Sequence, residues 1–315
     1  YLHIARVGYR PDEPVFSVRP PLYPLMIRWL GTLLRGGHRY LVAALLVSSA
    51  AALGYFVLFA LLARDTLGHR EGSWALLYLS AYPWAFFLLA GYAESLFLAL
   101  SALAFLASRR QRWWLAGTCA ACAALTRVQG TALVLPLLFE ALRQRRFRLR
   151  PLPLEVFWTL LPGLAAAGFL VWRSVTGFPP MQMVWSVHFH DYAAPPWKSL
   201  TYAAQVLCSR TAHIADYLDF GAALLFLALT VIAWRELPTV YALYMTGVWL
   251  LSLSHVRAPH PLASAGQYML TSFPAFFLLG RTGSRSAWWN RLIFYPSLAL
   301  LLFLSANFFL WGWSG

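Results

Sequence analysis

The sequence predicts an all-α, polytopic membrane protein with about ten transmembrane helices, some of them short or re-entrant. The chain is 60% hydrophobic and only 11% charged, whereas a soluble protein is roughly half apolar and a quarter charged. The apolar residues fall in long blocks rather than in amphipathic stripes, and arginines gather in the short connections between blocks. Together these observations favour a membrane-embedded helical protein.

The apolar blocks differ in length. Blocks 113–126 and 130–142 are too short to cross a bilayer comfortably, so we expect tilted short helices or a re-entrant hairpin packed within protein. Pro83, Pro136 and Pro274 interrupt some of the blocks and loosen their predicted boundaries. In chain order the blocks are 40–63, 73–90, 93–108, 113–126, 130–142, 153–175, 217–234, 238–256, 267–280 and 289–311.

The arginine-rich connections predict the orientation. Connections 109–112, 143–152 and 281–288 all fall on one side if residue 1 starts outside and each block crosses once. The positive-inside rule makes that side cytoplasmic. We therefore expect an extracytoplasmic loop over 1–38 and one transmembrane domain over 39–315, with a further outer loop at about 176–216.

The net charge of +14 would favour nucleic acid as a partner of a soluble domain. Here the basic residues lie between apolar blocks, so we predict membrane lipids as partners and no nucleic acid. Cys119, Cys122 and Cys208 are too few for a disulfide framework. The Cys-x-x-Cys spacing lies in an alanine-rich block, where small residues favour close helix packing.

The opening stretch, residues 1–30, is aromatic and proline-rich and becomes amphipathic from Tyr23 to Leu34. This pattern predicts a loop followed by a short helix in the membrane interface, with Arg28 and Trp29 at head-group level. The stretch either binds a ligand or only anchors the chain at the surface.

Glu94 interrupts two apolar runs, in GYAESLFLAL. The sequence predicts a turn after Gly91 and a helix beginning near Ser95, which places Tyr92 and Glu94 at the outer end of that helix. A carboxylate there is favoured by the helix dipole and can cap the first turn. Glu94 is therefore either a cap or a site residue.

Arg127 and Gln129 fall in a predicted tight turn, and Gly130 would permit an unusual backbone conformation there. Arginine binds phosphate bidentately and suits an anionic lipid head group. Snorkelling or a salt bridge with Glu94 would explain Arg127 equally well.

The segment HFHDY, 188–192, is a weak metal-binding pattern, because no second ligand cluster accompanies it. Asp216 and Asp219 begin a predicted helix and are interpreted as serving its N-terminus. No phosphate-binding glycine loop, nucleophile elbow or zinc signature is present in the sequence. We therefore predict neither a metal site nor a cofactor.

With these stretches in order, the chain resembles the PIG-V-type mannosyltransferases, the family of the second mannosyltransferase of GPI-anchor synthesis and its prokaryotic relatives. Four short motifs carry the resemblance, in family order. They are Tyr1-Leu-x-Ile-Ala-x-x-Gly8-Tyr9 with Pro21-Leu-Tyr23-Pro24-Leu, Tyr92-x-Glu94-Ser95-Leu96-Phe97, Thr126-Arg127-x-x-Gly130, and Gln267-Tyr268 with Phe273-Pro274.

The resemblance implies a GT-C fold and an inverting glycosyltransferase, with its site on the extracytoplasmic face. It implies a polyprenyl-phosphate-linked sugar donor, typically mannose, and a lipid or glycan acceptor. In this chemistry a carboxylate deprotonates the acceptor hydroxyl and cations stabilise the departing phosphate. Glu94 is predicted to support catalysis, and the predicted substrate-binding residues are Tyr9, Arg19, Tyr23, Tyr92, Ser95, Arg127, Gln129, His190, Gln267 and Tyr268.

The sequence departs from the family in two places. A Trp-Asp pair, whose Asp is the favoured base, precedes the family's Tyr-Leu, and this sequence begins just after it. We therefore expect an N-terminal truncation that removes the first helix and the main base. Gln267 stands where the family has arginine, which weakens a phosphate-binding role there.

Two other functions fit a polytopic membrane protein: a transporter of lipid-linked sugar, and a non-catalytic membrane subunit. A transporter would show internal pseudo-symmetry and charges near the middle of its helices, and neither is clear. Lys198 is the single lysine among 25 basic residues, which favours a prokaryotic plasma membrane over the endoplasmic reticulum.

Overall fold

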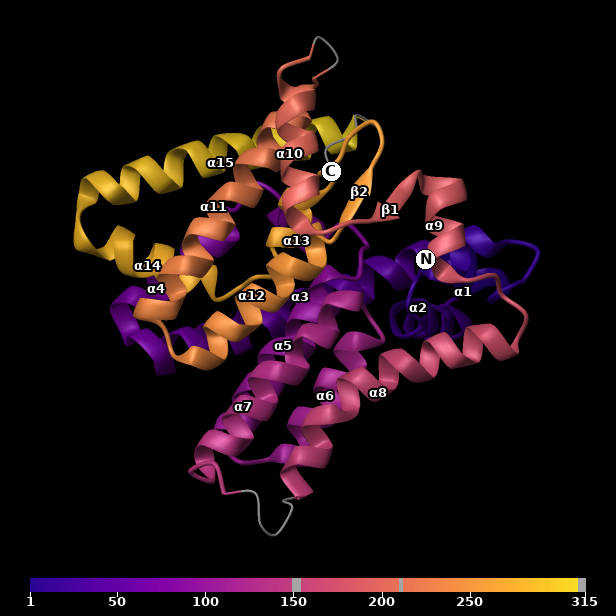
Figure 1. Ribbon diagram of the computed structural model, residues 1–315, viewed down its shortest axis with the longest axis horizontal. Helices are drawn as coiled ribbons and strands as arrows, with labels where there is room; N and C mark the ends of the chain where they lie inside the picture. The colour runs from indigo at the N-terminus through magenta and orange to yellow at the C-terminus, as the bar shows by residue number, and fades with distance from the viewer. Residues whose placement is uncertain (149–153, 210–211, 311–315) are drawn as a thin grey trace. The chain divides into compact units, whose positions relative to one another are not determined.

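The computed structural model describes residues 1–148, 154–209 and 212–310, and within them the chain is almost entirely helical (Figure 1). The short strand β1 (Asp191–Ala193) pairs antiparallel with β2 (His255–Arg257). The predicted all-α membrane fold is confirmed. Arg150 of the second arginine-rich connection, the first residue of block 153–175 and the last residue of block 289–311 lie outside the described residues.

Among the described residues, four helices are long and apolar enough to cross a membrane, and they coincide with four of the predicted blocks. Several other blocks contain shorter helices, because proline lacks the amide that continues a helix. Block 73–90 has a helix that ends before Pro83, and block 267–280 is divided ahead of Pro274. The four long helices are α3 (Arg39–Leu67), α8 (Leu154–Val175), α11 (Ile214–Glu236) and α15 (Ala287–Phe309).

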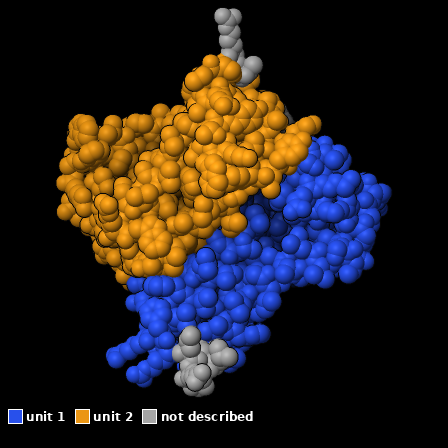
Figure 2. Space-filling view, in the orientation of Figure 1, with its two compact units in different colours: residues 1–58, 87–188 blue, residues 59–86, 189–315 orange. Residues whose placement is uncertain are grey.

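The chain divides into two compact units, coloured separately in Figure 2. Unit 1 comprises residues 1–58 and 87–188, and unit 2 comprises residues 59–86 and 189–315. Helix α3 contributes to both units. No sequence feature predicted this division.

Unit 1 begins with three short helical segments before α3. They are α1 (Leu2–Val7), η1 (Pro14–Val18) and α2 (Leu22–Leu33). Tyr23 and Ile27 of α2 are fully buried in a cluster with Ala43, Ala44 and Val47 of α3. The predicted helix after Tyr23 is therefore present, and its place in the membrane interface stays a prediction.

Helices α5, α6, α7 and α8 complete unit 1 and pack against one another (Figure 1). Their close approach depends on small residues: a Cβ added to Gly117 would lie 2.3 Å from the backbone oxygen of Trp158. Cys119 and Cys122 lie in the alanine-rich helix α6 and are free cysteines. The elements are α5 (Glu94–Arg109), α6 (Trp113–Ala124), η3 (Val128–Leu133), α7 (Val134–Gln144) and α9 (Met181–Phe189).

In unit 2, α14 packs tightly against α4. A Cβ on Gly280 would lie 2.6 Å from the amide nitrogen of Ala75, and one on Gly283 would overlap the phenol of Tyr78. The remaining elements of unit 2 are α4 (His69–Ser80), η2 (Ala85–Leu88, at the boundary), α10 (Pro196–Leu207), α12 (Thr239–Leu253), α13 (Ala265–Met269) and α14 (Ala275–Arg285).

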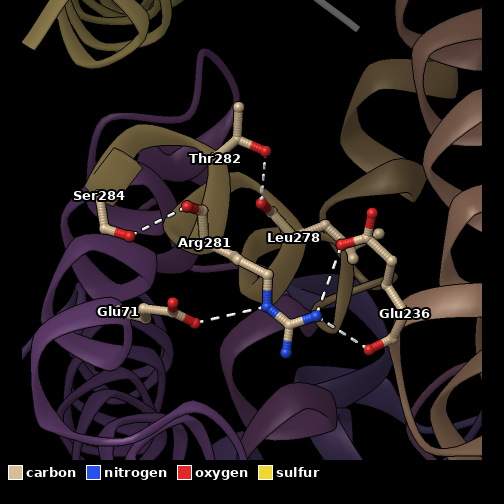
Figure 3. Close-up of polar contacts among 6 residues, drawn as sticks. All are labelled: Glu71, Glu236, Leu278, Arg281, Thr282 and Ser284. Carbon is tan, nitrogen blue, oxygen red and sulfur yellow. Dashed lines mark hydrogen bonds and ion pairs between the residues drawn. The ribbon is translucent and has the colours of Figure 1, made fainter. Parts of the chain in front are cut away.

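Arg281 joins three helices of unit 2 (Figure 3). Its Nε lies 3.4 Å from Glu71 in the first turn of α4. Its Nη1 donates to the backbone oxygen of Glu236, the last residue of α11, at 3.0 Å, and lies 3.4 Å from the carboxylate of Glu236. Arg281 belongs to the predicted cytoplasmic connection 281–288, but the sequence did not predict its partners.

We expect Arg281→Met to lower the free energy of unfolding by less than about 1 kcal/mol, because these ion pairs are partly exposed and screened by water. The loss should shrink as salt is added. Unfolding in detergent at low and high salt measures both effects. Arg285→Met, at an exposed arginine on the same helix, is the control, and an equal loss in both variants would contradict a specific role for Arg281.

Candidate functional site

Glu94 is the first residue of α5 and is fully buried. The chain turns into the helix at Gly91, whose φ of 76° favours glycine. The N-cap residue is Ala93, and the Glu94 carboxylate lies in the first turn of the helix, where the helix dipole favours it. The carboxylate forms an ion pair with Arg127, whose side chain is 10% exposed.

Arg127 is held in an extended conformation between α6 and η3. Its amide donates to the backbone oxygen of Ala123 at 2.9 Å, and its own backbone oxygen accepts from Gly130 at 2.9 Å. Its Nε lies 3.4 Å from Oε1 of Gln129. The turn therefore directs the guanidinium toward Glu94. The resulting salt bridge is one of the alternatives that the sequence left open for Arg127.

Gly130 is required for a reason other than the predicted one. It does not adopt a positive φ, so its role is not an unusual backbone conformation. A Cβ there would lie 2.3 Å from the amide nitrogen of Ala124. Glycine is needed because η3 passes against the end of α6.

We expect Gly130→Ala to destabilise the protein by about 2 kcal/mol, since the new methyl group must displace backbone at the end of α6. Thermal unfolding in detergent measures the change. Gly168→Ala is the matched control, because nothing lies within 4 Å of a Cβ at that position in α8. Equal stability of the two variants would contradict the tight contact.

Tyr23 and Tyr92, both predicted site residues, are joined through Ser48 of α3. The Ser48 hydroxyl donates to the backbone oxygen of Tyr92 at 2.8 Å, so its oxygen accepts from the phenol of Tyr23 at 2.7 Å. Ser48 was not a predicted site residue, although a polar residue inside an apolar block was the signal available. It ties the turn before Glu94 to α2.

Charged side chains shift the pKa of the Tyr92 and Tyr23 phenols: Glu94 acts on both, and Arg19 acts on Tyr92. Burial, and to a lesser extent the Glu94 carboxylate, raises the pKa of Tyr92, while Arg19 opposes the shift. Burial also raises the pKa of Tyr23, with Glu94 adding to the effect. Both phenols are therefore neutral hydrogen-bonding groups.

Arg19 itself is exposed, and among the described residues no carboxylate pairs with it. Its guanidinium lies 5.9 Å from the centre of the Tyr1 ring. Ser95, next to Glu94, is fully buried, and its hydroxyl finds no hydrogen-bond partner in the described chain. The cluster thus carries two arginines and one carboxylate, a net positive charge beside tyrosine rings, which suits an anionic ligand.

Of the other predicted site residues, Tyr9 lies in unit 1, and His190, Gln267 and Tyr268 lie in unit 2. His190 has a φ of 50°, and its backbone oxygen accepts from Ala258 at 3.1 Å. Gln267 is buried in α13, and the ring of Tyr268 lies 6.2 Å from that of His255. A role for these residues in binding substrate stays a prediction.

Asp191 ends the predicted metal-binding pattern but pairs with cations instead. Its carboxylate lies 3.1 Å from Nδ1 of His255 and 3.4 Å from Nη2 of Arg257. Burial alone would raise the pKa of Asp191, but attraction to His255 and Arg257 outweighs it and lowers the pKa. In the part of the chain that the structure describes, no group of three His, Cys, Asp or Glu residues is arranged to hold a metal ion.

Asp216 and Asp219 have different roles. Asp216 forms a capping box with His213 at the start of α11. It therefore serves the helix N-terminus, as the sequence predicted for both aspartates. Asp219 instead accepts hydrogen bonds from the backbone amides of Ser264 at 3.1 Å and Gly266 at 2.8 Å. The prediction that Asp219 serves its own helix is therefore wrong, because α13 supplies closer donors.

Solved structures similar to this chain include ArnT from Cupriavidus metallidurans bound to undecaprenyl phosphate, with 18% identity and a TM-score of 0.53. The apo form of the same protein also matches, with 18% identity and a TM-score of 0.51. Each match covers 88% of this chain and 52% of the ArnT chain, so the chain spans about half the length of the structures it resembles. No protein-family model and no curated protein matches the chain. ArnT has the GT-C membrane fold, so the predicted GT-C-like fold is confirmed.

Proposed function

We propose that the chain belongs to a membrane glycosyltransferase that transfers a sugar from a polyprenyl-phosphate donor to a lipid or glycan acceptor. The observation that carries the proposal is the buried Glu94–Arg127 ion pair, together with the exposed Arg19, which acts electrostatically on Tyr92 as Glu94 does. The fold supports it, because ArnT, which has the same fold class, is bound to undecaprenyl phosphate in its structure. We further propose mannose as the sugar and a PIG-V-type relationship, on the four sequence motifs.

The proposed chemistry needs a cationic group where the phosphate departs. The acceptor oxygen forms a bond to the anomeric carbon as the bond from that carbon to the phosphate oxygen breaks, so the configuration inverts. The acceptor proton passes to a base, and the electron pair stays on the leaving phosphate. Arg127 and Arg19 would stabilise that growing negative charge.

Glu94 has a supporting role in this mechanism. Its carboxylate holds Arg127 in the cluster, so we do not assign it as the base that receives the acceptor proton. Gln129, which approaches Arg127, and the neutral phenols of Tyr23 and Tyr92 would orient the sugar or the phosphate. Under the positive-inside prediction the reaction takes place on the extracytoplasmic face of a prokaryotic plasma membrane.

The full-length protein, purified in lipid nanodiscs, tests the proposal. It is supplied with radiolabelled undecaprenyl-phosphate-mannose, with carriers bearing other sugars, and with a lipid extract as acceptor. We expect label to move from the carrier to acceptor lipid, fastest with mannose. Transfer from a carrier bearing another sugar alone would contradict mannose, and no transfer with any carrier would contradict the glycosyltransferase.

A further inference from the structure

Arg173, in the last turn of α8, is a buried cation. Only 3% of the residue is exposed. Its Nη2 donates to the hydroxyl of Ser17 at 2.9 Å and to the backbone oxygen of Pro179 at 3.1 Å. Among the described residues no Asp or Glu pairs with it, and its buried Nε has no acceptor. A buried charge without a counter-charge is costly, so the contacts that it does make are informative.

The guanidinium of Arg173 lies against one ring of an aromatic cluster, 5.9 Å from the centre of the Phe178 ring. The rings of Tyr9, Trp172 and Phe169 complete that cluster by packing on one another and on Phe178. Cation–π attraction and the negative end of the helix dipole both favour a cation at this place. An apolar side chain at this position would avoid the free-energy cost of burying a charge, so stability alone does not account for an arginine here.

The hydrogen bond to Ser17 fixes the segment that carries Arg19. Ser17 also donates to the backbone oxygen of Pro14 at 2.6 Å, within η1. Helix η1 ends at Val18, directly before Arg19. Arg173 therefore holds the short helix whose end sets the backbone of Arg19.

Tyr9 gives Arg19 a second support from the same aromatic cluster. The phenol of Tyr9 donates to the backbone oxygen of Arg19 at 2.7 Å. The Tyr9 ring packs edge-on against Trp172, with centres 5.3 Å apart. Both supports of Arg19 thus lead back to the end of α8, next to Arg173.

We propose that Arg173 is a positioning residue that holds Arg19, through Ser17 and η1, in place to bind the phosphate of the polyprenyl donor. The inference rests on the proposed function, since it gives Arg19 a phosphate to bind. It adds a residue far from the sequence motifs, 156 positions from Ser17. Arg173 acts through the backbone of Arg19 and does not touch the phosphate.

The test uses Arg173→Met, Ser17→Ala, Arg19→Met and the double variant Arg173→Met/Arg19→Met, in nanodiscs. Two quantities are measured: hydrogen–deuterium exchange of residues 9–19, and the dissociation constant for undecaprenyl phosphate. Arg10→Met, at an exposed arginine of the same segment, is the control. Ser17→Ala removes the hydrogen bond between Ser17 and Arg173 while leaving the buried guanidinium in place. It therefore still tests the inference if Arg173→Met does not fold.

We expect Arg173→Met and Ser17→Ala to raise exchange in residues 9–19 at least tenfold, with α3 and α5 unchanged. Both should weaken undecaprenyl phosphate binding about fivefold. Arg19→Met should weaken binding without raising exchange, and the double variant should bind no more weakly than Arg19→Met, because both act through one contact. In the transfer assay kcat/KM for the donor should fall at least fivefold in both variants, because Arg19 acts on the donor phosphate in the complex and in the transition state.

Unchanged exchange in Ser17→Ala and Arg173→Met would overturn the inference, and so would additive losses of binding in the double variant. Raised exchange with unchanged binding would also overturn it, since Arg19 would then not depend on the link. Failure of the proposed function has a different result: wild-type protein itself would bind no undecaprenyl phosphate, which removes the inference together with its premise.

Discussion

Replacement of Glu94 by Gln is expected to reduce sugar transfer at least tenfold while expression stays normal. Glutamine keeps the size of the side chain but removes the charge that holds Arg127. The guanidinium would then lose its fixed direction, and its stabilisation of the leaving phosphate would weaken. A tenfold loss corresponds to about 1.4 kcal/mol of transition-state stabilisation.

The matched control is Glu140→Gln. Glu140 is also a buried carboxylate of unit 1 that pairs with an arginine, Arg143, at 2.7 Å, but it lies near the C-terminal end of α7, beside the predicted cytoplasmic connection 143–152. Initial rates and melting temperatures of both variants, measured in nanodiscs, separate catalysis from folding. Normal turnover in Glu94→Gln would mean that the ion pair serves only the fold.

Replacement of Asp219 by Ala is expected to destabilise unit 2 by about 3 kcal/mol. The carboxylate is 4% exposed and accepts from two backbone amides, those of Ser264 and Gly266. Each buried amide left without an acceptor costs roughly 1–3 kcal/mol. Ser264 also has a φ of 71°, a conformation that is unfavourable for serine unless neighbouring contacts hold it.

Unfolding in detergent and amide exchange of residues 262–268 measure this effect. Asp216→Ala, one turn earlier on α11, is the control: it removes a capping contact, which is worth about 1 kcal/mol. Asp219→Asn keeps one acceptor and is expected to fall between Asp219→Ala and the wild type. A loss in Asp219→Ala no greater than in Asp216→Ala would contradict the anchoring of α13 by Asp219.

The motifs located part of the site because hydropathy and turn chemistry are local. Glu94 and Arg127 are prominent in the sequence because each interrupts an apolar run. Their pairing was left open, since 33 residues separate them and no spacing rule connects two helix ends at that distance. The sequence also left open whether Glu94 caps α5 or pairs with Arg127, and the structure shows that the ion pair forms.

Arg173 and Ser48 were not among the predicted site residues. Arg173 looks like one more arginine at the end of a membrane helix, where snorkelling is the ordinary explanation. Ser48 sits among alanines and leucines in α3, where a serine is common in packed membrane helices. What distinguishes both residues is the partner that each meets, Ser17 for the first and the backbone of Tyr92 for the second.

By itself the sequence determined that this protein is helical, that it is built from apolar segments suited to a membrane, and which polar residues interrupt them. These properties follow from composition and period along the chain, which are local. The tertiary structure decided that Glu94 meets Arg127, that Asp219 holds α13 rather than its own helix, and that Arg173 reaches η1. Such pairings depend on which helices pack together, and that is settled by side-chain contacts between segments far apart in the chain.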